Sequence, residues 1–253
     1  MKLSNKAGQL TLFVIVAIII ISALTIGLLY FKTSQEKIPI EDVQGYIEKC
    51  INDELKISET KLLENNGYMN LSDNYLIYYG KKVPYLCKAT QFYVPCINQE
   101  PLYISHLKTE LKNDIEKKSQ MCFSDLKYLL EKKGYSVDEG IMNLNLNIEQ
   151  KMIIVNIDKK FNIRKESESK NYNNFKSTIL SSLYDLAITS GRIVNYESTF
   201  CEFDNVGWML SNSDSKVYRF VTSDGSKVYT VTDRVSNDSI KFAVKTCVMP
   251  AGI

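Results

Sequence analysis

The sequence predicts an α+β protein, with an N-terminal transmembrane helix followed by an exported domain of helices and mostly antiparallel strands. Residues 10–31 form an unbroken apolar run. Beyond it, apolar residues recur at helical spacing in some segments and alternate with polar residues in others. The order of these segments, helix, hairpin and helix followed by strands, helix and strands, favours α+β over an alternating α/β fold.

The apolar run is long enough to cross a bilayer. No residue from Ala7 to Phe31 is charged, and 22 helical residues span about 33 Å, whereas a hydrocarbon core is about 30 Å thick. A cleavable signal peptide usually has a shorter apolar region. We therefore expect a single-pass membrane anchor, with residues 1–9 as a short basic cytoplasmic tail and residues 32–40 as a linker.

The lysines that flank the apolar run, Lys2 and Lys6 against Lys32 and Lys37, nearly balance, so the free α-amino group decides the expected orientation. Lys2, Lys6 and the α-amino group precede the apolar run, and positive charge favours the cytoplasmic side. The remainder of the chain is then extracytoplasmic.

The octet Lys6-Ala7-Gly8-Gln9-Leu10-Thr11-Leu12-Phe13 resembles the class III signal of archaeal type IV pilins and related surface proteins. In that family a lysine and a small residue precede a Gly-Gln junction. The resemblance implies processing between Gly8 and Gln9, with Thr11 at the hydroxyl position. Phe13 stands where the family has a glutamate, a residue that helps processing and subunit registration.

Residues 41–140 form the first region of the predicted exported part. Apolar residues at helical spacing predict a helix over residues 41–64, and the sequence Asn65-Asn66-Gly67 ends it. Two short β-prone runs follow, at residues 75–79 and 83–86, and predict a hairpin. A second, long helix begins after Pro101 and ends at Gly134.

Residues 141–253 form the second region, either one domain with the first or separate from it. Leucines and asparagines alternate in residues 142–148, so this run and residues 152–157 predict a hairpin. The remaining predicted elements are a loop at 164–170, a helix carrying Phe175, Ile179, Leu183 and Leu186 and ending at Gly191, and strands at 193–203, 216–222, 227–232 and 240–248.

All six cysteines lie beyond the apolar run, and their even number suits disulfides in an oxidising compartment. Cys87 and Cys96 bracket a short segment that a bridge could close. Cys201 and Cys247 both fall in the strand-rich C-terminal part. Cys50 and Cys122 lie on the apolar stripes of two predicted helices. Local context therefore favours these three pairs among fifteen possible pairings.

The sequence offers little evidence of catalysis, metal binding or nucleic-acid binding. No close Cys pair with further Cys or His is present to hold zinc, and His106 is the single histidine, predicted to be exposed. No phosphate-binding loop or hydrolase motif occurs, so we expect no cofactor. Without Lys2 and Lys6, 29 basic residues balance 29 acidic ones, so no basic excess favours nucleic acid.

These observations predict a membrane-anchored extracytoplasmic protein with a structural or binding role and without catalytic activity. Its partners would be the membrane and other proteins, or further copies of itself, at the cell surface. One alternative is a pilin-like filament subunit, and another is an envelope enzyme with an unrecognised site. The tyrosines Tyr75, Tyr78, Tyr79, Tyr85 and Tyr93 supply a hypothetical recognition surface.

Overall fold

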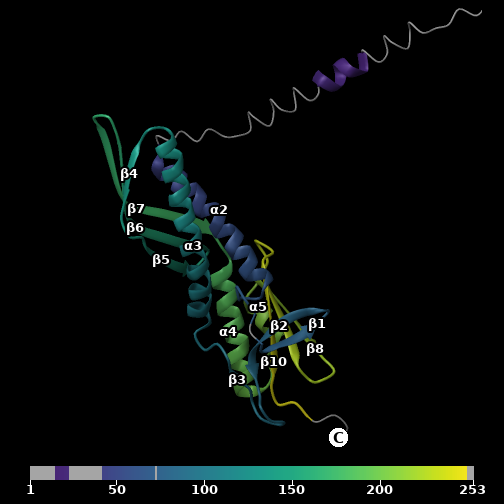
Figure 1. The fold of residues 1–253 in the computed structure, drawn as a ribbon. Coiled ribbons are helices and arrows are strands. Elements are labelled where there is room, and N and C mark those ends of the chain that lie inside the picture. The colour runs from purple at the N-terminus through teal and green to yellow at the C-terminus, as the bar shows by residue number, and fades with distance from the viewer. Residues whose placement is uncertain (1–14, 23–41, 72, 250–253) are drawn as a thin grey trace, which may run out of the picture. The chain divides into compact units, whose positions relative to one another are not determined.

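The computed structural model describes residues 15–22, 42–71 and 73–249. The chain divides into two units, Met1–Asp42 and Val43–Ile253, and each is described by itself. In the first unit, residues 15–22 form a helical segment with exposed side chains. The labelled helices and strands of Figure 1 all belong to the second unit.

The structure overturns the predicted transmembrane helix over residues 10–31. Within the described parts of the chain, no helix combines the length and the apolar character that a membrane span requires. The rest of the predicted span lies outside the described residues, as do the predicted tail 1–9 and linker 32–40.

The first sheet has four strands, and the longest of them pairs with the other three. The strands are β4 (Ser136–Glu139), β5 (Asn143–Glu149), β6 (Met152–Lys165) and β7 (Glu168–Leu180). β6 pairs antiparallel with β5 and β4 along one edge and with β7 along the other. In β5 the leucines are buried and Asn143 and Asn145 are exposed, as a strand with one covered face requires.

Two helices cover the buried face of this sheet. They are α2 (Val43–Glu64), which contacts β7, and α3 (Tyr103–Lys132), which contacts β4 and β5. Both present a buried apolar stripe with a helical period of three to four residues. Gly134, with a φ of 81°, follows the end of α3, where a left-handed residue satisfies the last carbonyls.

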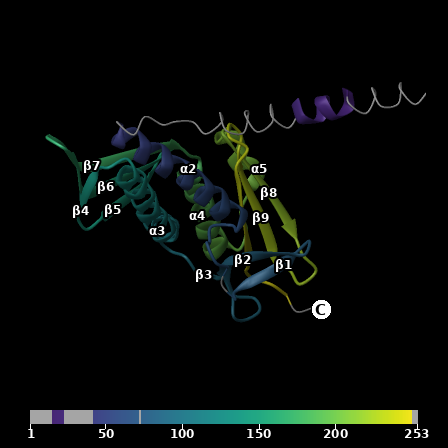
Figure 2. The same ribbon diagram turned by 45° about the horizontal axis from the view of Figure 1, so that its top comes forward.

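The second sheet has six strands and packs against the helix α4 (Figure 2). Its strands are β1 (Tyr75–Tyr78), β2 (Lys81–Lys88), β3 (Ile97–Asn98), β8 (Ser215–Val221), β9 (Lys227–Asp233) and β10 (Ser239–Lys245). The order is β1-β2-β10-β9-β8, and β3 pairs with β2. α4 (Leu183–Phe200) contacts β2, β9 and β10, whereas the short α5 (Asn205–Ser211) contacts β8.

The predicted loop 164–170 is wrong, and the predicted helix after it is wrong at Phe175 and Ile179 but right from Leu183, where α4 begins. Strands β6 and β7 continue through this segment and meet in a tight turn at residues 166 and 167. Phe175 and Ile179 are four residues apart, and positions i and i+4 share a face in a strand as well as in a helix. The helical period therefore could not be told from the strand period at these two residues.

The helix α4 runs through Gly191, which was predicted to end a helix, and through residues 193–200, which were predicted to be a strand. Its buried residues Leu186, Ser190 and Ile193 lie at helical spacing on the side that packs against the second sheet. Tertiary packing therefore overrides the breaking tendency of one glycine. The chain leaves the helix at Cys201, whose φ of 59° is left-handed.

Among the described strands the pairing is mostly antiparallel, as predicted, and the exception lies near the centre of the second sheet. β2 and β10 run parallel, with Ala243 opposite Tyr85 and Lys245 opposite Lys88. Antiparallel neighbours can be joined by a short turn, whereas a parallel pair needs a long connection. No turn in the sequence links these two strands, so their direction could not be predicted locally.

Candidate functional site

The six cysteines form three disulfides, and the structure joins the same three pairs that local context favoured. Cys50 bridges to Cys122 between α2 and α3, with a Cα–Cα distance of 6.0 Å. Cys87 bridges to Cys96 across 5.4 Å, and Cys201 bridges to Cys247 across 5.8 Å. Three disulfides indicate an oxidising, extracytoplasmic location. The predicted processing junction, Gly8 and Gln9, lies outside the described residues.

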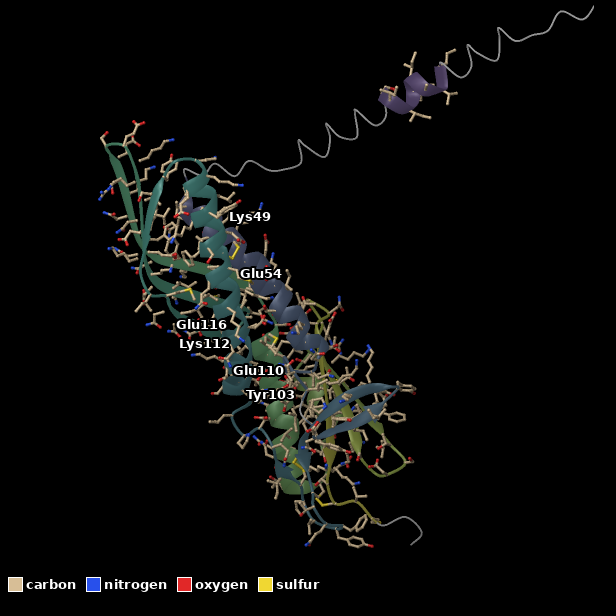
Figure 3. The ribbon with its side chains drawn as sticks, in the orientation of Figure 1. Lys49, Glu54, Tyr103, Glu110, Lys112 and Glu116 are labelled. Atoms are coloured by element: carbon tan, nitrogen blue, oxygen red, sulfur yellow. A yellow bond between two sulfur atoms is a disulfide. The ribbon has the colours of Figure 1, made fainter. Side chains whose placement is uncertain are left out.

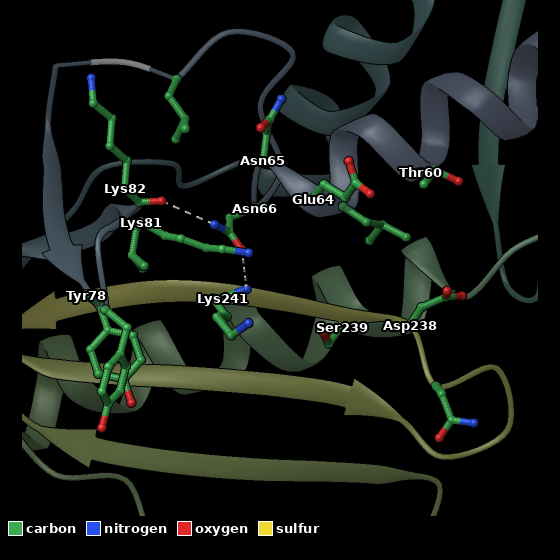
Figure 4. Close-up of a pocket in the computed structure, with 15 residues that line it drawn as sticks. Thr60, Glu64, Asn65, Asn66, Tyr78, Lys81, Lys82, Asp238, Ser239 and Lys241 are labelled. Carbon is green, nitrogen blue, oxygen red and sulfur yellow. Dashed lines mark hydrogen bonds between the residues drawn. The ribbon is translucent and has the colours of Figure 1, made fainter.

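A cavity of about 1040 Å³ opens where three distant segments of the second unit meet (Figure 4). The C-terminal end of α2 supplies Glu64 and the turn after it supplies Asn66. The β1–β2 hairpin supplies tyrosines and lysines, and the start of β10 supplies Ser239 and Lys241. Its volume lies just above the range of about 300–1,000 Å³ that is common for ligand pockets. We treat this cavity as the candidate functional site and call it the lysine–tyrosine cavity.

Asn66 holds the wall of this cavity together. Its Oδ1 accepts a hydrogen bond from the backbone N–H of Lys241 at 3.1 Å, and its Nδ2 donates to the carbonyl of Lys82 at 3.4 Å. The dashed lines in Figure 4 mark both bonds. The parallel pairing of β2 and β10 is confined to residues further along both strands. The Asn66 side chain therefore bridges the two strands beside the cavity, where they do not bond to each other.

Helix α3 fixes the segment that carries Asn66. The backbone N–H of Met69 donates to Oε2 of Glu110 at 2.7 Å, and Nε2 of His106 donates to the carbonyl of Gly67 at 3.0 Å. Tyr103, which Figure 3 labels with Glu110 on α3, donates its O–H to the carbonyl of Asn66 at 3.5 Å. Burial raises the pKa of Tyr103, so the phenol keeps its proton as a donor.

Gly67 is required at this turn for two reasons. Its φ is 95°, a conformation that residues with a side chain rarely adopt, and a Cβ there would collide with the phenol oxygen of Tyr103.

His106 is half-buried beneath this turn rather than exposed as predicted. Its ring lies 4.5 Å from the ring of Tyr68, centroid to centroid. Its contacts give it a structural role beneath the segment that carries Asn66.

The tip of the β1–β2 hairpin places an aromatic residue in an uncommon backbone conformation. Tyr79 and Gly80 have φ values of 49° and 75°, and Tyr78 pairs directly with Lys81, so the turn has two residues. Positive φ at both central residues is the type I′ arrangement, in which asparagine usually precedes glycine. Tyr79 lines the cavity and is 83% exposed. The turn therefore holds a tyrosine beside the cavity in a conformation that disfavours tyrosine.

The charges of the cavity are unevenly paired. Lys81, Lys82 and Lys241 form no ion pair with a carboxylate of the described residues, although Nζ of Lys82 lies 4.1 Å from the centroid of the Tyr75 ring. Figure 4 shows the Lys81 side chain extending across the cavity towards Asn66. These lysines therefore have unused capacity to bind an anion.

The acidic residues near the cavity, Glu59, Glu64 and Asp238, form no ion pair with a described lysine or arginine. The Asp238 carboxylate accepts a hydrogen bond from Oγ of Ser182 at 2.7 Å. Behind it, Glu59 is only 9% exposed and accepts a hydrogen bond from Ser181. Burial, opposed by this hydrogen bond and reinforced by the charge of Asp238, raises the pKa of Glu59 to about 7.

Comparison with protein-family models, with curated proteins and with solved structures finds no match to this chain. The geometry alone therefore carries the functional argument. The sequence pointed to Tyr78 and Tyr79 through the concentration of tyrosines, but it gave no sign of Asn66, Asp238 or Lys241. Asn66 could be read only as part of a helix stop, because its partners lie on strands far away in the sequence.

Proposed function

We propose that this chain is an extracytoplasmic binding protein without catalytic activity, and that the lysine–tyrosine cavity binds an acidic segment of a protein partner. The proposal depends on one observation: three lysines without carboxylate partners line the same cavity as two tyrosines. An acidic peptide supplies carboxylates for the lysines and backbone groups for the neighbouring amides.

The remaining lining residues suit recognition of a polypeptide. Tyrosine offers a large amphipathic contact at low entropic cost, and asparagine and serine offer adaptable hydrogen bonds. Tyr78, Tyr79, Asn65, Asn237 and Ser239 all line this cavity. The same combination of residue types dominates the binding loops of antibodies.

The charge of the cavity favours an acidic partner. Two carboxylates, those of Glu64 and Asp238, stand against three ammonium groups, and Asp238 already accepts a hydrogen bond from Ser182. Complementary charge increases association rates and excludes partners of the same sign. Screening by salt would weaken such binding, since much of the cavity is open to solvent.

The experiment is a titration of the full chain, under non-reducing conditions, into a fluorescein-labelled hexaglutamate peptide, followed by fluorescence polarisation. We expect saturable binding that weakens as salt is added. The double variant K81E/K241E should bind at least about tenfold more weakly, because it reverses two charges that face the ligand.

The control variant is K117E/K133E, which reverses two exposed lysines outside the cavity. It makes the same change in net charge and should leave the affinity close to that of the parent chain. Equal affinity for a hexaglutamine peptide, or an equal loss in both double variants, would contradict the proposal.

A further inference from the structure

We infer that the second unit carries another binding site, specific for a neutral oligosaccharide, in a cavity between α4, the β5–β6 turn and the segment after α5. This cavity has a volume of about 570 Å³ and is separate from the lysine–tyrosine cavity. Its binding role is independent of the function proposed above. The inference depends on one aromatic residue and on the mixed polar groups around it.

The aromatic residue is Trp208, the single tryptophan of the chain. It is half-buried on α5, a seven-residue helix without a single buried residue, and it lines the cavity. Its ring has an aromatic neighbour in Phe203, at 6.2 Å between centroids. A large aromatic side chain left partly open beside polar groups is unusual for core packing and typical of a ligand-contact surface.

Hydrogen bonds at both ends of α5 hold Trp208 in place, although the helix is short. Asp204 caps the helix by accepting hydrogen bonds from the backbone N–H groups of Val206 and Gly207, at 3.2 and 2.9 Å. At the other end, Nδ2 of Asn212 donates to the carbonyl of Trp208 at 2.9 Å. The tryptophan is thus held by local hydrogen bonds, and its ring is not required to fill the core.

The polar groups of the cavity include both donors and acceptors. Lys151, in the β5–β6 turn, lies with its Nζ 3.0 Å from Asp185 of α4 and 3.6 Å from Asp233 at the end of β9. Arg192 lies further along α4 than Asp185 and also lines the cavity. It is exposed and forms no hydrogen bond or ion pair with any described residue. Asp214 completes a set of three carboxylates and two cations.

This combination fits the chemistry of a sugar. A pyranose ring has an apolar C–H face, which packs on an aromatic ring, and a rim of hydroxyl groups that each donate and accept. Carboxylates accept from such hydroxyls, and the Arg192 guanidinium donates with five N–H groups in fixed geometry. Because charges of both signs are nearly balanced, a strongly charged ligand would meet repulsion from one set.

The test uses the intrinsic fluorescence of the full, disulfide-bonded chain, because the single tryptophan reports on this cavity alone. The probes are maltotriose, cellotriose, mannotriose and chitotriose, titrated one at a time. We expect at least one trisaccharide to give a saturable change in emission. R192A should weaken that binding at least about fivefold, the effect of losing one net hydrogen bond.

Two controls separate this site from the rest of the molecule. R164A removes another exposed arginine, outside the cavity, and K81E/K241E alters only the lysine–tyrosine cavity, so both should keep the parent affinity. Isothermal titration calorimetry of the parent chain measures the same binding without relying on the fluorophore. The inference would be overturned if none of the four trisaccharides bound at about 10 mM, a concentration far above typical dissociation constants. It would also be overturned if R192A bound as tightly as the parent chain.

Discussion

Lys227 and Glu197 form a buried ion pair that joins strand β9 to helix α4. Nζ of Lys227 lies 2.8 Å from Oε2 of Glu197, and the Glu197 side chain is fully buried. The phenol of Tyr229 donates to Oε1 of the same carboxylate. Burial and this hydrogen bond raise the pKa of Tyr229. The Glu197 carboxylate thus has partners on both oxygens, which is the condition under which a charge is tolerated away from water.

The first prediction concerns this pair. K227M should lower the free energy of unfolding by about 3–5 kcal/mol, because it leaves the buried charge of Glu197 without its cation. Urea unfolding followed by circular dichroism measures the change. K245M is the matched control, since Lys245 pairs with Asp224 at the surface, at 3.2 Å, and should cost at most about 1 kcal/mol. Similar losses in the two variants would refute the assignment.

The second prediction compares two disulfides. Replacing Cys50 and Cys122 together by alanine should cost about 4 kcal/mol, because this bridge spans 72 residues of sequence and restricts the unfolded chain strongly. Replacing Cys87 and Cys96, only 9 residues apart, should cost about 2.5–3 kcal/mol. Thermal unfolding under non-reducing conditions gives both values. The reverse order of stabilities would show that chain entropy does not dominate here.

The third prediction is a pH dependence of stability that arises from Glu59. Its pKa is raised from 4.5 to about 7, so the folded state binds the proton more tightly than the unfolded state does. The contribution is therefore fully present below pH 4.5 and is lost as the pH rises through 7, a change of about 3 kcal/mol. E59Q carries no ionisable group there and should lack this component.

The measurement is urea unfolding of the parent chain and of E59Q at pH 5 and pH 8. The difference between their free energies of unfolding should change by about 2.5 kcal/mol between the two values of pH. E48Q, at an exposed position of the same helix, serves as the control and should follow the parent chain. If E59Q also follows the parent chain, the buried carboxyl does not titrate as described.

The fourth prediction separates stability from binding at the hairpin tip. Y79N should raise the free energy of unfolding by about 0.5–1 kcal/mol, because asparagine adopts a positive φ more readily than tyrosine. The same variant should weaken binding of the hexaglutamate peptide, since Tyr79 lines the cavity. Chemical unfolding and fluorescence polarisation measure the two effects.

Tyr93 supplies the control for this prediction. Its φ is 62°, also left-handed, and it lies outside the lysine–tyrosine cavity. Y93N should therefore stabilise the chain similarly while leaving peptide affinity unchanged. A loss of affinity in Y93N equal to that in Y79N would show that the tyrosine side chain acts indirectly.

Several elements of the fold could be predicted because their signals are local. The helices α2 and α3 follow from apolar spacing and from the glycines after them, and the β5–β6 hairpin follows from alternating leucine and asparagine. The segment around Phe175 and Ile179 was misread because a separation of four residues suits both a helix and a strand. Of residues 10–31 only 15–22 are described, and no described helix is long and apolar enough to span a membrane.

By itself, the sequence determined the α+β class, the main amphipathic elements and the oxidising compartment that three disulfides indicate. These depend on period, composition and cysteine number, which are properties of neighbouring residues. Only the tertiary structure decided the parallel pairing of β2 with β10, the buried Glu197–Lys227 pair and the two cavities. Each of these joins residues far apart in the chain, and such contacts form only when many elements pack together and exclude water.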